Sequence, residues 1–509
     1  MLSRRTLLTS GCSALAGSML GLELTARGNS AGTSHRPNVV FIMTDQQCAE
    51  AMSCRMGKQL INTPALDSLA AGGMVFTRAY TPNPLCMPAR NSLFTGRYPH
   101  ETGVTKNAQV NLDPAEFPCL GTYFRQAGYE TAYYGKWHLC FNQKDVRAHG
   151  FETPRAPADK TQDQDARAAG SAAWFITQRH EKPFLLVVSL LNPHNICEYA
   201  RGQALPCGPI GETPLPEQCP PAPANLAPPE NEPDSMTMMR KGYHASPLFP
   251  VGDFAVAKWR QVRWAYYRMI EKVDAEIGKV LLALRRTGLE DKTLVLFTSD
   301  HGECAGAHGF NQKTVFYEES VHVPLIVHQK GLTRQGTSDR TVNTGLDLLP
   351  TMLDFAGIER PRKLTGRSLK PLSLGEPVTQ WRDHLVLENH MDQAGAVGDL
   401  RPALQGRMVR TERYKYCVYS QGRQRESLVD LQTDPGETKD LAQNPAYRQV
   451  LLEHRALLAR FAREHNDPLA ASLLADDVAP RPFTAGAVQD SDGKTGKKRA
   501  KRLKTGIKQ

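Results

Sequence analysis

Short, uninterrupted runs of β-branched and aliphatic residues, widely spaced along the chain, are the feature that most restricts its fold. They are residues 38–44 (NVVFIMT), 183–190 (PFLLVVSL), 293–298 (TLVLFT) and 323–327 (VPLIV). Runs without polar alternation are typical of strands buried on both faces, as in a parallel sheet. Residues 254–284 carry apolar side chains every three or four positions and precede Gly288, which predicts a long amphipathic helix. Alternating strands and helices predict an α/β sheet with helices on both faces.

Two changes of composition divide the chain further. Residues 200–250 are rich in proline and lack periodicity, so we expect an excursion or lid loop there rather than core. After a second change near 374–381, residues 408–419 and 427–431 predict strands of a meander, and residues 451–461 predict a helix packed on it. The predicted parts are an export signal at 1–30, a large domain that carries the functional site at 31–380, a small antiparallel α+β subdomain at 381–475 and a disordered basic tail at 476–509.

The formal net charge of +10 is typical of a nucleic-acid-binding protein, but its distribution argues against that class. Arg4 and Arg5 contribute two positive charges, and residues 493–509 contribute eight without any acidic residue. The rest of the chain is therefore formally neutral, and we expect no nucleic-acid partner. The basic tail either holds an anionic polysaccharide or membrane surface, or serves as a solubilising end.

The N-terminus has the layout of an export signal. Arg4 and Arg5 precede a run from Thr6 to Leu22 that carries no charge and is rich in Leu, Ala and Gly. Residues 3–8 (SRRTLL) resemble the twin-arginine type, whose cargo crosses the membrane already folded. We therefore expect a periplasmic or extracellular protein, with a lipoprotein anchor through Cys12 left open. No later apolar stretch is long enough for a transmembrane helix.

The cysteines do not define a disulfide framework. Eleven cysteines are too few for a disulfide scaffold in 509 residues. Cys207 and Cys219 lie in the proline-rich segment and could pair in an oxidising compartment, but cargo that folds before export needs no disulfide. Their pairing stays open at this point.

Polar side chains follow three of the predicted strands. Asp45 and Gln46 follow the first, Asn192–His194 the second, and Asp300 and His301 the third. A single carboxylate at such a position could equally cap the next helix, but three sites together favour a ligand crevice at the carboxyl ends of the strands. Two carboxylates, an amide and an imidazole suit Ca²⁺, Mg²⁺ or Mn²⁺, and no Cys/His pattern has the spacing of a zinc site.

Residues 84–97 (PLCMPARNSLFTGR) hold the most specific motif, Cys86-x-Pro-x-Arg90 followed by Leu-Phe-Thr-Gly-Arg. This stretch resembles the type I sulfatases, in which a maturation enzyme reads Cys-x-Pro-x-Arg and oxidises the cysteine to formylglycine. Met87 departs from the small residue that is usual there. Further elements of the same family are residues 128–138 (GYETAYYGKWH), 299–303 (SDHGE) with His308, Gly309 and Lys313, and 430–437. The resemblance covers roughly residues 36–465 in the expected order.

The resemblance implies a sulfuric ester hydrolase of alkaline-phosphatase-like fold: a large mixed, mainly parallel sheet between helices, with a small C-terminal antiparallel α+β subdomain. Formylglycine made from Cys86 would offer two hydroxyls on one carbon, one to attack sulfur and one to release the sulfate afterwards. A divalent cation would act as a Lewis acid, bound by Asp45, Gln46, Cys86, Asp300 and His301. Gln46 and His301 replace the commoner Asp and Asn of calcium-dependent members, so Ca²⁺ is the first expectation and Mn²⁺ the second, with Mg²⁺ possible.

The remaining roles follow from matching motif positions. Arg90 would orient the formylglycine, and Lys136 and Lys313 would hold sulfate oxygens as point charges. His138 would accept a proton from the second hydroxyl, and His194 would donate one to the leaving oxygen.

Other polar residues near these motifs are expected to be structural. We interpret His308 and His322 as histidines that either support the site residues from behind or pack in the core, Glu303 as a helix-start residue rather than a base, and Cys304 as a small buried residue.

A sulfated saccharide is the favoured substrate, and other small sulfate esters stay open. Arg240, Lys241 and His244 lie in the proline-rich segment, where they could meet an acidic sugar. Two other hypotheses remain: a phosphodiesterase or phosphonate monoester hydrolase of the same fold, and a catalytically silent protein that binds sulfated glycans if Cys86 is never oxidised. Rates on paired sulfate and phosphate esters of one alcohol separate the first from a sulfatase.

Overall fold

The computed structural model describes residues 36–484, except 109 and 157–162. The predicted export signal and the predicted tail from residue 485 onward lie outside the described residues. Within the described part, no helix combines the length and the apolar character needed to cross a membrane.

A seven-stranded sheet forms the centre of the larger domain, with the strand order β4-β5-β1-β6-β7-β2-β8. The strands are β4 (Glu130–Gly135), β5 (Phe184–Pro193), β1 (Asn38–Asp45), β6 (Thr293–Ser299), β7 (Leu325–His328), β2 (Met74–Phe76) and β8 (Gly336–Ser338). β4, β5, β1 and β6 run parallel. The expected mixed, mainly parallel α/β sheet is thus confirmed.

One predicted central strand of a parallel sheet runs the other way. β7, expected from residues 323–327, pairs antiparallel with both β6 and β2. No helical crossover returns the chain to the far end of the sheet between β6 and β7, so β7 starts at the edge where β6 ends.

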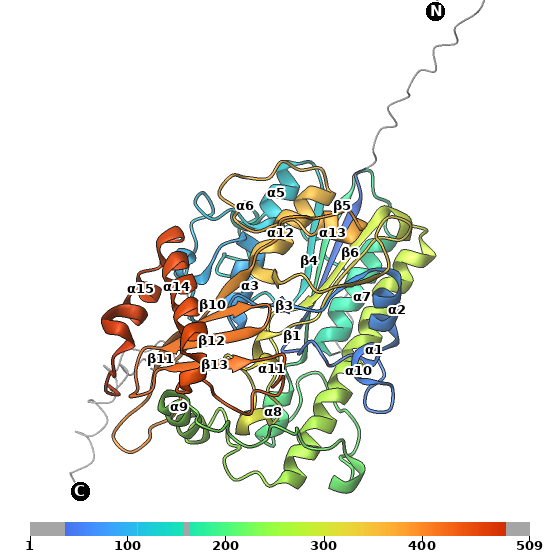
Figure 1. Ribbon diagram of the computed structural model, residues 1–509. Helices are drawn as coiled ribbons and strands as arrows, with labels where there is room; N and C mark the ends of the chain where they lie inside the picture. Colours follow the sequence, from blue (N-terminus) through green and yellow to red (C-terminus); the bar gives the residue numbers. More distant parts are fainter. Residues whose placement is uncertain (1–35, 109, 157–162, 485–509) are drawn as a thin grey trace, which may run out of the picture. The chain divides into compact units, whose positions relative to one another are not determined.

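Helices cover both faces of this sheet (Figure 1). Val40 and Ile42 of β1 point to a core shared with α2 (Pro64–Gly72), α7 (Gln164–Thr177) and α10 (Val256–Arg286). Phe41 and Met43 point to the opposite core, shared with α3 (Cys86–Thr95), α5 (Leu120–Gln126) and α12 (Thr344–Phe355). Alternate residues of one buried strand therefore anchor both layers. The predicted helix at 254–284 is α10.

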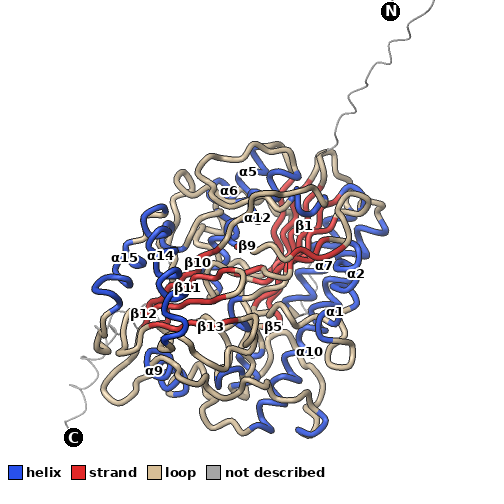
Figure 2. The backbone as a smooth tube through the Cα atoms, viewed as in Figure 1, coloured by secondary structure: helices blue, strands red, loops and turns tan. Residues whose placement is uncertain are grey.

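The C-terminal subdomain is a four-stranded antiparallel sheet, visible as a separate group of strands in Figure 2. Its strands are β10 (His384–Met391), β11 (Leu404–Thr411), β12 (Tyr414–Tyr419) and β13 (Glu426–Asp430). The single strand expected over 408–419 is wrong, because the chain reverses between Thr411 and Tyr414 and splits this run into β11 and β12. α14 (Arg448–Glu464) and α15 (Pro468–Leu474) cover one face, as the helix predicted at 451–461 requires.

The other face of this sheet corrects the prediction for residues 200–250. α9 (Asp234–His244) lies in that segment, and its Met236, Met239 and Tyr243 are buried with Met408 and Tyr419 of the small sheet. Proline-rich composition concealed this helix, whose apolar side chains form part of the core between the small sheet and the segment that joins β6 to β7. The segment is therefore not a lid loop throughout.

The predicted start of the tail is also early by several residues. Residues 476–484 pack on the subdomain: Ala479 accepts a hydrogen bond of 2.8 Å from Arg425, and Gly422 pairs with Arg481. The described cysteines are all free thiols, including Cys207 and Cys219.

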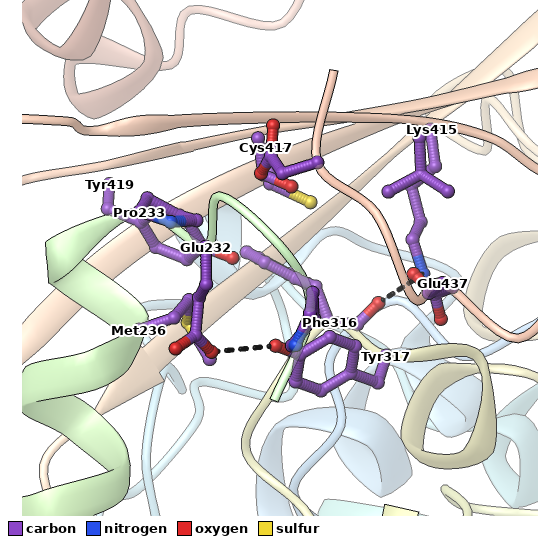
Figure 3. A pocket seen from close by; sticks show the side chains of 13 residues that line it. Glu232, Pro233, Met236, Phe316, Tyr317, Lys415, Cys417, Tyr419 and Glu437 are labelled. Carbon is purple, nitrogen blue, oxygen red and sulfur yellow. Dashed lines mark hydrogen bonds and ion pairs between the residues drawn. The ribbon is translucent and has the colours of Figure 1, made fainter. Parts of the chain in front are cut away.

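A seam of buried charge joins the small sheet to the segment between β6 and β7. Lys415 forms a buried ion pair with Glu437, and its Nζ donates to the carbonyl oxygen of Phe316 at 2.8 Å (Figure 3). The Glu437 carboxylate also accepts from the backbone N–H of Glu318 at 2.6 Å. The pocket drawn there has a volume of about 20 Å³, enough for about one water molecule. The subdomain thus fixes the far end of the β6–β7 segment.

The remaining elements are short. They are α1 (Ser53–Met56), β3 (Ala79–Tyr80), α4 (Pro99–Thr102), α6 (Val146–His149), α8 (Ile196–Ala200), α11 (Glu318–Val321), β9 (Val342–Asn343), α13 (Lys370–Leu374) and the 3₁₀ turns Pro216–Gln218, Glu290–Lys292, Ala307–Gly309, Pro445–Tyr447 and Ala475–Val478.

Candidate active site

The carboxyl ends of the central strands place the predicted site residues side by side. β1 lies between β5 and β6, so Asp45, at the end of β1, is flanked by His194 after β5 and Asp300 after β6. Lys136 follows β4, the neighbour of β5. Parallel strands end at one edge of a sheet, which is why residues far apart in the sequence meet there.

Cys86 enters this cluster from the N-terminus of α3. Its Sγ lies 3.2 Å from His301 Nε2 and 3.9 Å from Asp45 Oδ1, and it is 1% exposed. Arg90, one helical turn later, points the same way and donates to Asp300 Oδ2 at 2.7 Å and to Asp45 Oδ2 at 3.0 Å. The spacing of four residues in the motif is therefore the spacing that puts both side chains on one face of the helix.

Two lysines and two histidines surround the same thiol. Lys136 Nζ lies 2.5 Å from Asp45 Oδ2, and the buried Lys313 lies 2.5 Å from the side-chain oxygen of Gln46. His138 and His194 also lie beside Cys86: His138 helps to lower the pKa of the Cys86 thiol, and Cys86 opposes the lowering of the pKa of His194 by burial.

Burial and charge compete at these groups. Burial raises the pKa of the Cys86 thiol, but Lys313, Lys136 and His301 outweigh it, so the pKa lies well below that of a free thiol. Burial and the charge of Cys86 likewise raise the pKa of Asp45, while Lys136, His194 and Arg90 hold it below its usual value. The cluster therefore stabilises negative charge at residue 86.

The donor set fits a divalent cation. Asp45, Cys86, Asp300 and His301 each offer one ligand atom, these atoms all lie within 4.8 Å of one another, and all four residues are buried. His301 Nδ1 donates to the carbonyl oxygen of Gly302 at 3.1 Å, which leaves Nε2 facing the cluster in the neutral ring. Two carboxylates with one imidazole are ligands that Ca²⁺, Mn²⁺ and Mg²⁺ accept.

Gln46, the fifth predicted ligand, is also fully buried beside the cluster. Its backbone N–H donates to Asp300 Oδ1 at 3.1 Å, while its side chain contacts Lys313, Glu303 and Cys197. Its role as a ligand stays a prediction.

Several expectations for neighbouring residues can be compared with the structure. The buried His308 stacks on Tyr317 and the partly buried His322 stacks on Tyr80, contacts that agree with packing roles, and Cys304 is buried as expected. Glu303 as a helix-start residue is wrong: it lies in an irregular loop, and its carboxylate accepts hydrogen bonds from the loop's own backbone.

The basic residues of the proline-rich segment do not converge on the site. Arg240 is buried in an ion pair with Glu232, and His244 Nε2 lies 2.8 Å from the carbonyl oxygen of Gly309. A pocket of about 780 Å³ between the domain and the subdomain is lined by none of the predicted site residues.

Sequence reasoning missed two buried contacts of the site. Ser189 Oγ accepts from Arg90 Nη1 at 2.7 Å, and Glu303 Oε2 accepts from Gln46 Nε2 at 2.5 Å. Ser189 is one polar residue inside an apolar strand, and Glu303 belongs to the SDHGE motif, so each had a weak signal in the sequence.

Comparison with known families agrees with this geometry. Residues 37–358 match the family described as Sulfatase, and residues 306–464 match the one described as N-sulphoglucosamine sulphohydrolase, C-terminal. The chain belongs to the sulfatase family. This sulfatase is a sulfuric ester hydrolase with the alkaline-phosphatase-like architecture expected from the motifs.

Its relatives match over most of its length. A Delta 4,5-hexuronate-2-O-sulfatase of Bacteroides thetaiotaomicron is 29% identical over 92% of this chain and 97% of its own. The sulfatase YidJ of Escherichia coli K12 is 33% identical over 67% of this chain and 72% of its own. Among solved structures, a 2-O GAG sulfatase is 28% identical with a TM-score of 0.74, covering 89% of this chain and 98% of the other.

Proposed function

We propose that this sulfatase removes a sulfate group from a carbohydrate by means of a formylglycine made from Cys86 and one bound divalent cation. The observation that carries the proposal is the surroundings of Cys86: a buried residue at a helix N-terminus within reach of two carboxylates, two ammonium groups and several imidazoles. A carbohydrate is favoured over an aryl or steroid sulfate because a relative that matches nearly the whole chain is named for a sulfated hexuronate.

The charged and polar side chains around residue 86 have different proposed roles. Lys313 and Lys136 would hold the anionic sulfate oxygens, and Arg90 holds Asp45 and Asp300 in place through buried ion pairs. His194 and His138 both lie beside residue 86: His194 would donate a proton to the leaving oxygen, and His138 would accept one from residue 86. Formylglycine supplies a nucleophile with two hydroxyls on one carbon. The cation, Ca²⁺ before Mn²⁺ or Mg²⁺, polarises a sulfate oxygen when it is bound by Asp45, Gln46, Asp300, His301 and residue 86.

Peptide mass spectrometry tests the central step. The peptide that contains residues 85–90 should carry an aldehyde or its hydrate in place of the thiol when the protein is made in a host with the maturation enzyme. Cys86→Ala, and protein from a host without that enzyme, should be folded and nearly inactive. Fully active protein with an unmodified thiol at Cys86 would refute the proposal.

A desulfation screen tests the substrate class. Defined sulfated saccharides, with an aryl sulfate as the comparison, should show the highest kcat/KM on a saccharide. A kcat/KM about tenfold or more higher on the aryl sulfate would contradict a carbohydrate substrate and indicate another class of sulfate ester.

The proposed setting is outside the cytoplasm. Arg4 and Arg5 support export through the twin-arginine route, so Lys-Lys in their place should trap the protein inside the cell. Unchanged export of this variant would favour the general secretory route or a lipoprotein fate through Cys12.

A further inference from the structure

Gln46 is held by contacts at every polar atom it has. Its backbone N–H donates to Asp300 Oδ1 at 3.1 Å, and its carbonyl oxygen accepts from the hydroxyl of Tyr266 at 2.8 Å. Its side-chain Nε2 donates to Glu303 Oε2, and its Oε1 accepts from Lys313 Nζ, both at 2.5 Å. The backbone of Gln46 has a φ of 76°, which a residue other than glycine keeps only where its surroundings impose it. The position of this amide is therefore set by its neighbours.

Glu303 decides which end of the amide points toward Lys313. One carboxylate oxygen of Glu303 accepts the backbone N–H groups of Ala305 at 2.9 Å and Gln312 at 2.6 Å. The other oxygen is left for Gln46, and an ionised carboxylate only accepts hydrogen bonds. The amide NH₂ must then face Glu303, which turns the amide oxygen toward Lys313 on the side of the metal cluster.

We propose that Glu303 is a positioning residue of the active site: it fixes the orientation of the Gln46 amide, so that the amide oxygen faces Lys313. The inference rests on the proposed function in one respect, since Gln46 is there a ligand of the cation. The hydrogen bonds of Glu303 go to Gln46, Ala305 and Gln312, and none goes to Asp45, Cys86, Asp300 or His301.

The variant Glu303→Gln tests whether Glu303 sets the orientation of the Gln46 amide. The new side chain keeps its oxygen on the N–H groups of Ala305 and Gln312, so its NH₂ faces Gln46. Two NH₂ groups cannot bond each other, and Gln46 has to rotate its amide by half a turn. Its NH₂ then faces the ammonium group of Lys313 and the cation. Neither of these can accept a hydrogen bond from the NH₂ group. We expect the affinity for the cation to fall about 10–100-fold, the range for partners that orient a metal ligand.

The double variant Gln46→Glu with Glu303→Gln should reverse the loss. The NH₂ group at position 303 then donates to a carboxylate at position 46, whose second oxygen faces Lys313 again. Affinity for the cation should return to within about threefold of the wild type, because an acceptor again faces Lys313. Gln46→Glu alone should behave worse than the double variant, since two buried carboxylates would then face each other.

Asp274→Asn is the matched control. Asp274 is a buried carboxylate on α10 that also accepts two backbone N–H groups, those of Ala65 at 3.0 Å and Leu66 at 2.9 Å, and it takes no part in the site. Asp274→Asn measures how much stability the protein loses when a buried carboxylate of this kind is replaced by an amide. We expect it to lower the unfolding midpoint while leaving the affinity for the cation unchanged.

Two measurements separate this inference from the proposed function. Calorimetric titration of the metal-free proteins with CaCl₂ and MnCl₂ should give similar affinities for wild type and the double variant. Glu303→Gln should bind the ions more weakly than both. Crystal structures of the metal-free proteins should show the contact between Lys313 Nζ and the side chain at position 46 broken in Glu303→Gln and regained in the double variant. If wild type binds neither ion, the metal role in the proposed function fails, and the crystal structures alone decide the positioning role. A Lys313 contact that survives in Glu303→Gln, or a double variant no better than the single one, would overturn the inference.

Discussion

Arg90 holds two buried carboxylates together, and replacing it with methionine should show how the site balances its charge. Arg90 donates to Asp300, Asp45, Ser189 Oγ and the carbonyl oxygen of Lys136, and the side chains of the arginine and both aspartates are 0% exposed. Removing one partner of a buried ion pair costs about 3–5 kcal/mol, because the remaining charge stays buried without compensation.

The cost of Arg90→Met should depend on the cation. After the substitution, Asp45 still has an ion pair with Lys136 at 2.5 Å. The remaining partners of Asp300 are the backbone N–H groups of Gln46 and His301 and the nearby imidazole of His301. Burial, followed by the charge of Asp45, already raises the pKa of Asp300, so we expect most of the loss there. A bound divalent cation would offset both carboxylates and reduce the difference from wild type to about half or less.

Urea unfolding with a chelator and with saturating CaCl₂ measures this dependence. Arg382→Met is the control, since Arg382 is largely buried and forms an ion pair with the buried Asp347 away from the site. Its cost should be similar and should not change with the cation. A cost below about 1 kcal/mol for metal-free Arg90→Met, or an equal effect of the cation on both variants, would contradict this account of the site.

Three further predictions follow from the same contacts. Asp300→Ala should abolish turnover with the fold retained in circular dichroism, and chelation should do the same reversibly; full activity of that variant would refute the metal assignment. Lys313→Met should lower kcat on a sulfated saccharide about 10²–10³-fold, the usual cost of losing one group that stabilises an anionic transition state, and a loss below tenfold would remove Lys313 from that role. Burial raises the pKa of Asp440 from 3.8 to about 6. Between these values the unfolded chain releases the proton and the folded chain keeps it, so stability should fall by up to about 3 kcal/mol as pH rises from 3.8 to 6. Asp440→Asn should lack this component in urea midpoints measured across that range, and an unchanged pH dependence would show that Asp440 titrates normally.

Motifs and periodicity were sufficient to predict much of this protein. Uninterrupted apolar runs predicted β1, β5 and β6 because strands buried on both faces have no polar alternation. The Cys86-x-Pro-x-Arg90 motif marked both residues as candidate site residues, and the structure places them on one face of α3. Carboxylates that directly follow such strands then had to meet at one edge of the sheet.

Other features depended on contacts between distant segments. The direction of β7 depends on where the long segment after β6 re-enters the sheet, and no local pattern records this. The apolar face of α9 is meaningful only beside the small sheet that covers it, so proline content concealed it. Glu303 looked like a helix start in the sequence, whereas its partners are the N–H groups of a strained loop and an amide more than 250 positions away.

Local sequence therefore indicated which groups are candidates for the chemistry, because each of them lies in a short motif or directly follows a predicted strand. The tertiary structure decided how those groups are oriented and charged. Burial next to Lys313, Lys136 and His301 sets the pKa of Cys86, and Glu303 decides which atom of Gln46 faces the site. Both effects need side chains from separate strands at distances of a few ångströms, and only the packing of the central sheet brings them that close.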